Sequence, residues 1–165
     1  MKTKLASPGA ATQPEFEPEF VAALKHLFEE AIVFNKMLGL TITEITPASV
    51  AATLPMQSMM IGHHLHQRMH GGVISATLDA LAGLAVMAAI GARHLDEPIA
   101  ARMARFARLG TIDLRIDYLR QAIGTEFKAR ASVMRLGSRV ASTRMEFFSA
   151  GDELLCTGAA AYIVS

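Results

Sequence analysis

The sequence contains a single cysteine, no tryptophan and almost no net charge. One cysteine cannot form an internal disulfide, so Cys156, in the apolar run "ELLCTGAAAYIV", is expected to be a core residue of a protein in the reducing cytoplasm. A net charge of +1 provides no field for binding a nucleic-acid backbone, so nucleic acid is not expected as a partner. Apolar residues make up 52% of the chain, which excludes a disordered protein.

The N-terminal region lacks the apolar segment of a signal peptide, because prolines at positions 8, 14 and 18 interrupt it. We therefore expect residues 1–15 to form a flexible tail. Residues 16–165 are enough for one domain with a sizeable core and too few for two.

The stretch from Gly71 to Ala92 is nearly all apolar, yet it carries an acid, Asp79, near its middle. An aspartate at the centre of a bilayer costs about 2.5–3.5 kcal/mol on insertion, and Gly83 with several alanines weakens the apolar drive. A soluble helix buried on nearly all sides explains the pattern better. No membrane span is therefore expected.

The other segments predict an α+β fold. Residues 19–39 have apolar side chains at helical spacing and end at Gly39, which predicts an amphipathic covering helix, and residues 40–56 contain two β-prone runs around Pro47. After a connector of residues 93–110, four runs at 111–119, 127–135, 140–148 and 154–164 predict an antiparallel sheet. In the first of these runs the alternation predicts one face of Ile112, Leu114, Ile116 and Tyr118 and another of Thr111, Asp113, Arg115 and Asp117.

The long apolar helix has a small-residue face around Asp79 and a large-residue face opposite. Helical spacing places Ser75, Ala76, Ala82 and Gly83 beside the acid and Ile74, Leu78, Leu81 and Leu84 on the core side. Small residues leave space for a ligand channel or a closely packed partner. A hydroxyl such as that of Thr77 or Thr111 could merely donate a hydrogen bond to the carboxylate. Burying an acid among apolar side chains costs free energy, however, which favours a functional role for Asp79.

The triplet His70-Gly71-Gly72 immediately precedes this helix. Unpaired N–H groups at the first turn, with the positive end of the helix dipole behind them, are suited to hold a developing oxyanion. The two glycines let a substrate carbonyl approach the main chain without a Cβ in the way.

The motif "HGGVISATLDALAGLA" resembles that of hotdog-fold acyl-CoA thioesterases of the PaaI type, in which a curved antiparallel sheet wraps a long central helix. "LGTIDLRIDYLRQA" resembles the next strand of that family, and the lead-in "MMIGHHLHQRM" is most similar to the bacterial YigI branch. The resemblance covers roughly residues 20–164.

This resemblance implies roles for individual residues. The Gly71 amide would polarise the thioester carbonyl, Asp79 would be the general base or nucleophile, and His70 would help to position the thioester, with Gly72 beside it. Thr111 stands where relatives have a Ser or Thr near the attacking water. No cofactor is implied, because coenzyme A is part of the substrate.

The sequence departs from the family where many relatives have an asparagine six or seven residues before the motif histidine. Here those positions are His64 and His63, and either could donate a hydrogen bond to substrate or water instead. Together with His66 and His70 they could also form a metal site. However, their spacing is loop-like and no cysteine or carboxylate nearby completes a set of ligands. The reaction also needs no Lewis acid, so no metal is expected.

Two groups of arginines are candidates for the phosphates of coenzyme A. Arg102, Arg105 and Arg108 recur every three residues in the connector, a pattern that also fits a solvated helix face. Arg135 and Arg139 flank the "LGS" turn, where relatives often contact the coenzyme, although a charged hairpin tip is an equally good interpretation.

Helix geometry predicts that two chains share each active site. Nine residues at about 100° each place His70 and Asp79 on opposite sides of the helix, about 13 Å apart along its axis. A two-fold axis would bring the Asp79 of one chain to the helix mouth of the other, that is, to the start of the long helix at His70-Gly71-Gly72. We therefore expect a homodimer, assembled further into a dimer of dimers.

The sequence thus predicts a cytoplasmic thioesterase that hydrolyses fatty or aromatic acyl-CoA. Two alternatives remain open at this point. One is a hotdog dehydratase or hydratase, which would pair a histidine with an acid for proton transfer at carbon. The other is an acyl-CoA-binding module without activity, which has no need of Asp79.

Overall fold

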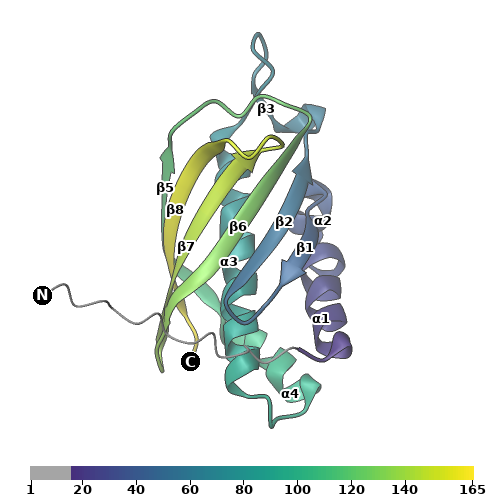
Figure 1. The fold of residues 1–165 in the computed structure, drawn as a ribbon, viewed down its shortest axis with the longest axis vertical. Coiled ribbons are helices and arrows are strands. Elements are labelled where there is room, and N and C mark those ends of the chain that lie inside the picture. The colour runs from purple at the N-terminus through teal and green to yellow at the C-terminus, as the bar shows by residue number, and fades with distance from the viewer. Residues whose placement is uncertain (1–15) are drawn as a thin grey trace, which may run out of the picture.

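The computed structural model describes residues 16–165, so the expected tail of residues 1–15 lies outside the described residues. A six-stranded antiparallel sheet in the order β1-β2-β6-β7-β8-β5 curves around the long helix α3, Gly71–Arg93 (Figure 1). The strands are β1 Thr41–Ile45, β2 Ser49–Pro55, β5 Gly110–Tyr118, β6 Glu126–Leu136, β7 Val140–Ser149 and β8 Leu154–Ile163. The α+β architecture expected from the resemblance is confirmed.

Three helical segments replace the single covering helix that the sequence predicts. They are α1 Pro18–Lys25, a π-helix His26–Ala31 and α2 Val33–Leu38, and the break falls at Ile32, which has extended backbone angles. The buried side chain of Asn35 donates to the Phe28 carbonyl across this break at 3.0 Å, so it offers that carbonyl a partner where the helical pattern is interrupted. Gly39 ends α2 in the left-handed conformation, at φ 72°, as its position in the sequence predicts.

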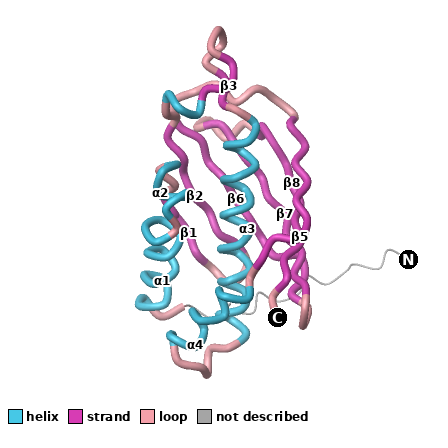
Figure 2. The backbone as a smooth tube through the Cα atoms, turned by 180° about the vertical axis from the view of Figure 1, so that it is seen from behind, coloured by secondary structure: helices cyan, strands magenta, loops and turns pink. Residues whose placement is uncertain are grey.

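Helix α3 packs against the sheet in the core, and the covering helices lie beside it (Figure 2). Figure 2 shows α1, α2 and α3 on the same face of the sheet. The predicted core side is confirmed, since Ile74, Leu78, Leu81 and Leu84 are all buried. Among the described residues α3 is the one helix long and apolar enough to cross a membrane, but most of it is buried inside the protein, as expected of a core helix.

Strand β5 is an edge strand with a bulge at Ile112. Thr111 pairs with Tyr162 of β8 and Asp113 with Ala161, so Ile112 has no partner and the alternation shifts there by one residue. The strict alternation predicted for this strand is therefore wrong at its start. Thr111 faces α3, on the same side as Tyr118, instead of facing away with Asp113.

The remaining elements lie at the two ends of α3. A short hairpin of β3 Ile61–His63 and β4 Arg68–Met69, preceded by a 3-10 turn at Ser58–Met60, projects beyond the sheet at the start of α3 (Figure 1). After the end of α3, the expected connector contains α4, Ile99–Ala104, and a 3-10 turn, Arg105–Arg108.

Candidate active site

Asp79 is half-buried on α3, and two hydroxyl groups contact its carboxylate. Thr111 of β5 donates to Oδ1 at 2.9 Å, and the hydroxyl of Tyr162 of β8 lies 2.7 Å from the same oxygen. Thr77 instead donates to the main-chain oxygen of Val73. Of the two hydroxyls that the sequence offered as partners, Thr111 is therefore the one that contacts the acid.

An apolar cavity of about 260 Å³ lies beside this carboxylate. Its walls come from the covering helices, the small-residue face of α3 and the start of β5. They comprise Phe28, Ile32, Phe34, Asn35, Ala76, Asp79, Ala80, Gly83, Phe106, Leu109, Gly110, Thr111 and Tyr162. Mostly apolar walls with a few polar groups at one point are typical of a binding site for an apolar group that reacts at one end.

Contacts among residues 16–165 leave one free amide in the first turn of α3. The His70 ring is the N-cap, because its Nδ1 accepts from the Gly72 N–H at 2.9 Å, and the His70 carbonyl accepts from Val73. This corrects the expectation of several free N–H groups. Within residues 16–165 the Gly71 N–H has no hydrogen-bond acceptor, so it remains available for a substrate oxygen.

The carbonyl oxygen of Gly71 accepts hydrogen bonds from two side chains. Tyr118 at the end of β5 donates to the Gly71 oxygen at 2.8 Å, and Ser75 donates to it at 3.0 Å. The two hydroxyl oxygens are 2.6 Å apart. A Cβ on Gly71 would approach the Tyr118 ring to 3.2 Å, so the glycine also permits this close packing.

A second cavity, of about 630 Å³, lies at this helix mouth. It is lined by Gly62, Arg68, Met69, His70, Gly71, Gly72, Ile74, Tyr118, Leu119, Arg120, Gln121 and Ala122. None of these residues lines the cavity at Asp79. One chain therefore presents the free amide and the carboxylate in two separate cavities.

The structure does not bring His63 and His64 to either cavity. The β3–β4 hairpin contributes Gly62 and Arg68 to the helix mouth, while the His63 ring stacks on His66 with their centroids 4.7 Å apart. Substitution of the family's asparagine by one of these histidines stays a prediction. Among the described residues no three His, Cys, Asp or Glu side chains are grouped so that they could hold a metal.

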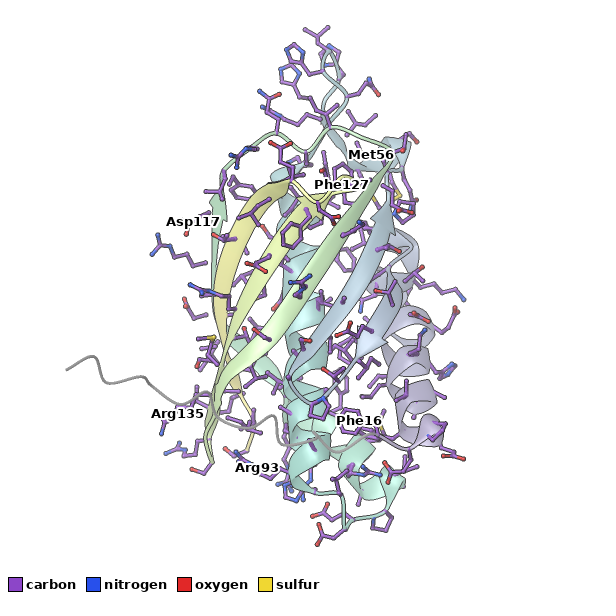
Figure 3. The ribbon with its side chains drawn as sticks, viewed as in Figure 1. Phe16, Met56, Arg93, Asp117, Phe127 and Arg135 are labelled. Carbon is purple, nitrogen blue, oxygen red and sulfur yellow. The ribbon has the colours of Figure 1, made fainter. Side chains whose placement is uncertain are left out.

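Arg135 and Arg139 lie far from Gly71 within one chain, and their contact with coenzyme A stays a prediction. Arg135 lies near Arg93, at the far end of α3 from Gly71 (Figure 3), and Arg139 belongs to the same hairpin tip. Over 23 helical residues the two ends are about 33 Å apart, so neither arginine reaches the helix mouth of its own chain.

The connector arginines are mostly engaged in ion pairs. Arg102 is buried, lies 2.6 Å from Glu17 and stacks over the Phe20 ring at 4.3 Å. Arg105 pairs with Glu97 at 2.6 Å. The predicted solvated face is therefore wrong for Arg102, whose charge holds α4 against α1 and is not exposed to a phosphate.

Cys156 is buried, as the sequence predicts. Burial raises the pKa of its thiol to about 11, so the thiolate is scarce at neutral pH. This leaves Asp79 as the candidate base or nucleophile.

Sequence reasoning missed Tyr162, Tyr118 and Asn35. Tyr162 stands out in the run "GAAAYIV" as one large polar-tipped residue among small ones, but its contact with Asp79 depends on the pairing of β8 with β5. Asn35 depends on the helix break at Ile32.

Comparisons with known proteins agree on one family. Residues 66–156 match the model of the Thioesterase superfamily. The chain is 35% identical over 138 residues to the medium/long-chain acyl-CoA thioesterase YigI of Salmonella typhimurium, covering 84% of this chain and 89% of that protein. The Escherichia coli K12 protein of the same name is 33% identical over the same length. A crystal structure from Shewanella oneidensis, of a protein related to the thioesterase superfamily, superposes with a TM-score of 0.83 at 33% identity, covering 91% of this chain and 100% of that one.

Proposed function

This chain belongs to the thioesterase superfamily, and we propose that it hydrolyses acyl-CoA thioesters of medium to long chain length at a site built from the Gly71 amide and the Asp79 carboxylate. The enzyme class and acyl-CoA hydrolysis follow from the relatives. The observation that carries the choice of site is a half-buried carboxylate, held by two hydroxyl donors, beside an apolar cavity.

The proposed chemistry uses groups that this chain supplies. The thioester carbonyl oxygen accepts from the free Gly71 N–H at the positive end of α3, which stabilises the negative charge that develops there. Asp79 takes a proton from a water molecule, and the oxygen of that water attacks the carbonyl carbon. The C–S bond then breaks, the proton held by Asp79 passes to the coenzyme A thiolate, and the thiol and the free acid leave. As a nucleophile, Asp79 would instead attack the carbonyl carbon, expel the coenzyme A thiolate and form an acyl anhydride that water then hydrolyses.

We propose that this site is completed by two chains. Among the described strands β5 forms an unpaired edge of the sheet, and it exposes Ile112 and Tyr118, at 57% and 51% of their surface. The same strand reaches the helix mouth through Tyr118 and the carboxylate through Thr111. Antiparallel pairing of two β5 strands about a two-fold axis would therefore carry the mouth of one chain toward the Asp79 of the other. We place the enzyme in the cytoplasm as a dimer of such dimers, in keeping with the resemblance and the free thiol.

The position of the His70 proton favours hydrolysis over hydration of a double bond. Because Nδ1 accepts from the Gly72 N–H, the neutral ring carries its proton on Nε2 and presents a donor, not a base. A hydratase would need the histidine to exchange protons at carbon. A simple binding module would need no carboxylate beside its acyl cavity.

Thiol release from a panel of acyl-CoA esters tests this proposal. We expect release to be fastest with medium and long acyl chains and to survive exhaustive chelation, because amides and a carboxylate suffice for the chemistry. Binding without thiol release, or hydration of enoyl-CoA in its place, would contradict the proposal. Loss on chelation with rescue by zinc would make the histidines of the hairpin a metal site.

A further inference from the structure

We propose that Tyr162 is a positioning residue that, with Thr111, fixes Oδ1 of Asp79 and leaves Oδ2 as the oxygen that takes the proton from water. This inference rests on the proposed function, in which Asp79 is the base. It assigns different tasks to the two carboxylate oxygens.

The contacts of Tyr162 restrain the conformation of Asp79. Its hydroxyl lies 2.7 Å from Oδ1 and 2.8 Å from the main-chain oxygen of the same residue, and it donates its one proton to this pair of acceptors. Contact with both the side chain and the main chain of Asp79 restricts rotation about Cα–Cβ. Thr111 approaches the same Oδ1 from the neighbouring strand and restricts rotation of the carboxylate plane.

The two donors contact only one of the two carboxylate oxygens. A carboxylate offers about four lone-pair positions, and here both side-chain donors are on one oxygen. Among the described residues Oδ2 accepts no hydrogen bond, so its lone pairs are free for water.

Tyr162 is itself held in place by the sheet. It is buried on β8 and pairs directly with Thr111 of β5, so the two donors belong to one registered pair of residues. Burial and the contact with the Asp79 carboxylate raise the pKa of Tyr162 far above its ordinary value, so the phenol remains a donor at the pH of the reaction.

The test is to remove each donor and compare the result with a matched control. Tyr162→Phe deletes only the hydroxyl, Thr111→Val deletes the second donor, and Thr111→Ser keeps a donor and should rescue activity. The control is Thr143→Val, which removes a buried hydroxyl on β7 that contacts Met145 and Ala160 and not Asp79.

We expect Tyr162→Phe to lower kcat by about 10- to 100-fold with little change in KM, the scale of one hydrogen bond to a charged group. Thr111→Val should lower kcat on the same scale, and Thr111→Ser should stay close to the wild type. Thr143→Val should leave kcat unchanged.

Crystal structures of the wild type and Tyr162→Phe keep this test independent of activity. The Asp79 side chain should hold one orientation in the wild type, with Oδ1 in contact with both hydroxyls, and more than one in Tyr162→Phe, whether or not the protein cleaves a thioester. A folded Tyr162→Phe protein with wild-type kcat and an unchanged Asp79 orientation would overturn the positioning role. Absence of thiol release by the wild type, together with the expected change in the orientation of Asp79, would overturn the proposed function alone.

Discussion

Asp79→Asn is expected to fold like the wild type and to lose about 10²–10⁴ in kcat, the usual effect of removing a general base. Asparagine keeps the shape of the side chain, and its amide oxygen can still accept from Thr111 and Tyr162. Its nitrogen, in the place of Oδ2, is a donor and cannot take a proton from water. Free-thiol release under saturating acyl-CoA measures this loss, and thermal unfolding checks the fold.

Two other outcomes of this variant would be informative. A loss well beyond 10⁴, with an acyl-enzyme detected on the wild type, would identify Asp79 as the nucleophile. Near-normal thiol release by a folded Asp79→Asn protein would remove Asp79 from the mechanism.

Gly71→Pro is expected to lower kcat by about 10²–10³ relative to Gly71→Ala, as removal of one oxyanion donor does. Proline deletes the free N–H and is well tolerated at the first position of a helix. The preceding residue, His70, already has φ −67° and ψ 133°, which a following proline allows. Alanine is the matched control, because it adds the same Cβ against the Tyr118 ring and keeps the N–H.

The comparison is made on kcat for proteins that unfold at similar temperatures. Equal rates for Gly71→Pro and Gly71→Ala would show that the Gly71 amide does not hold the oxyanion. A rise in KM alone would place the glycine in substrate binding instead.

Local pattern was enough to predict the helix at the centre of the fold. The spacing of Ile74, Leu78 and Leu81 gave the core side of α3, and the position of Asp79 among small residues gave the side with the cavity. The break at Ile32 was not predictable, because the residues on both sides of it continue the apolar spacing of a helix and the carbonyl contact from Asn35 forms only in the fold.

Contacts between strands could not be predicted from the sequence. A single bulge at Ile112 turns Thr111 from the outer face to Asp79, because a one-residue shift moves a strand side chain to the other face. Tyr162 lies 83 residues after Asp79, and only the pairing of β5 with β8 brings them together. The turn of Arg135 and Arg139 indicated either a contact with coenzyme A or a charged hairpin tip, and only the fold shows that it lies at the end of α3 away from Gly71 (Figure 3).

The central claim, that two chains build each site, is tested most directly by mixing two inactive variants. Gly71→Pro chains keep Asp79, and Asp79→Asn chains keep the Gly71 amide, so a mixed dimer rebuilds one complete site. Random pairing makes about half of the dimers mixed, and about a quarter of the wild-type sites should return. Co-expressed chains should therefore release thiol at about a quarter of the wild-type rate, while each parent stays nearly inactive. Chains that are shown by two different tags to associate, yet have no more activity than either parent, would show that water is activated within a single chain.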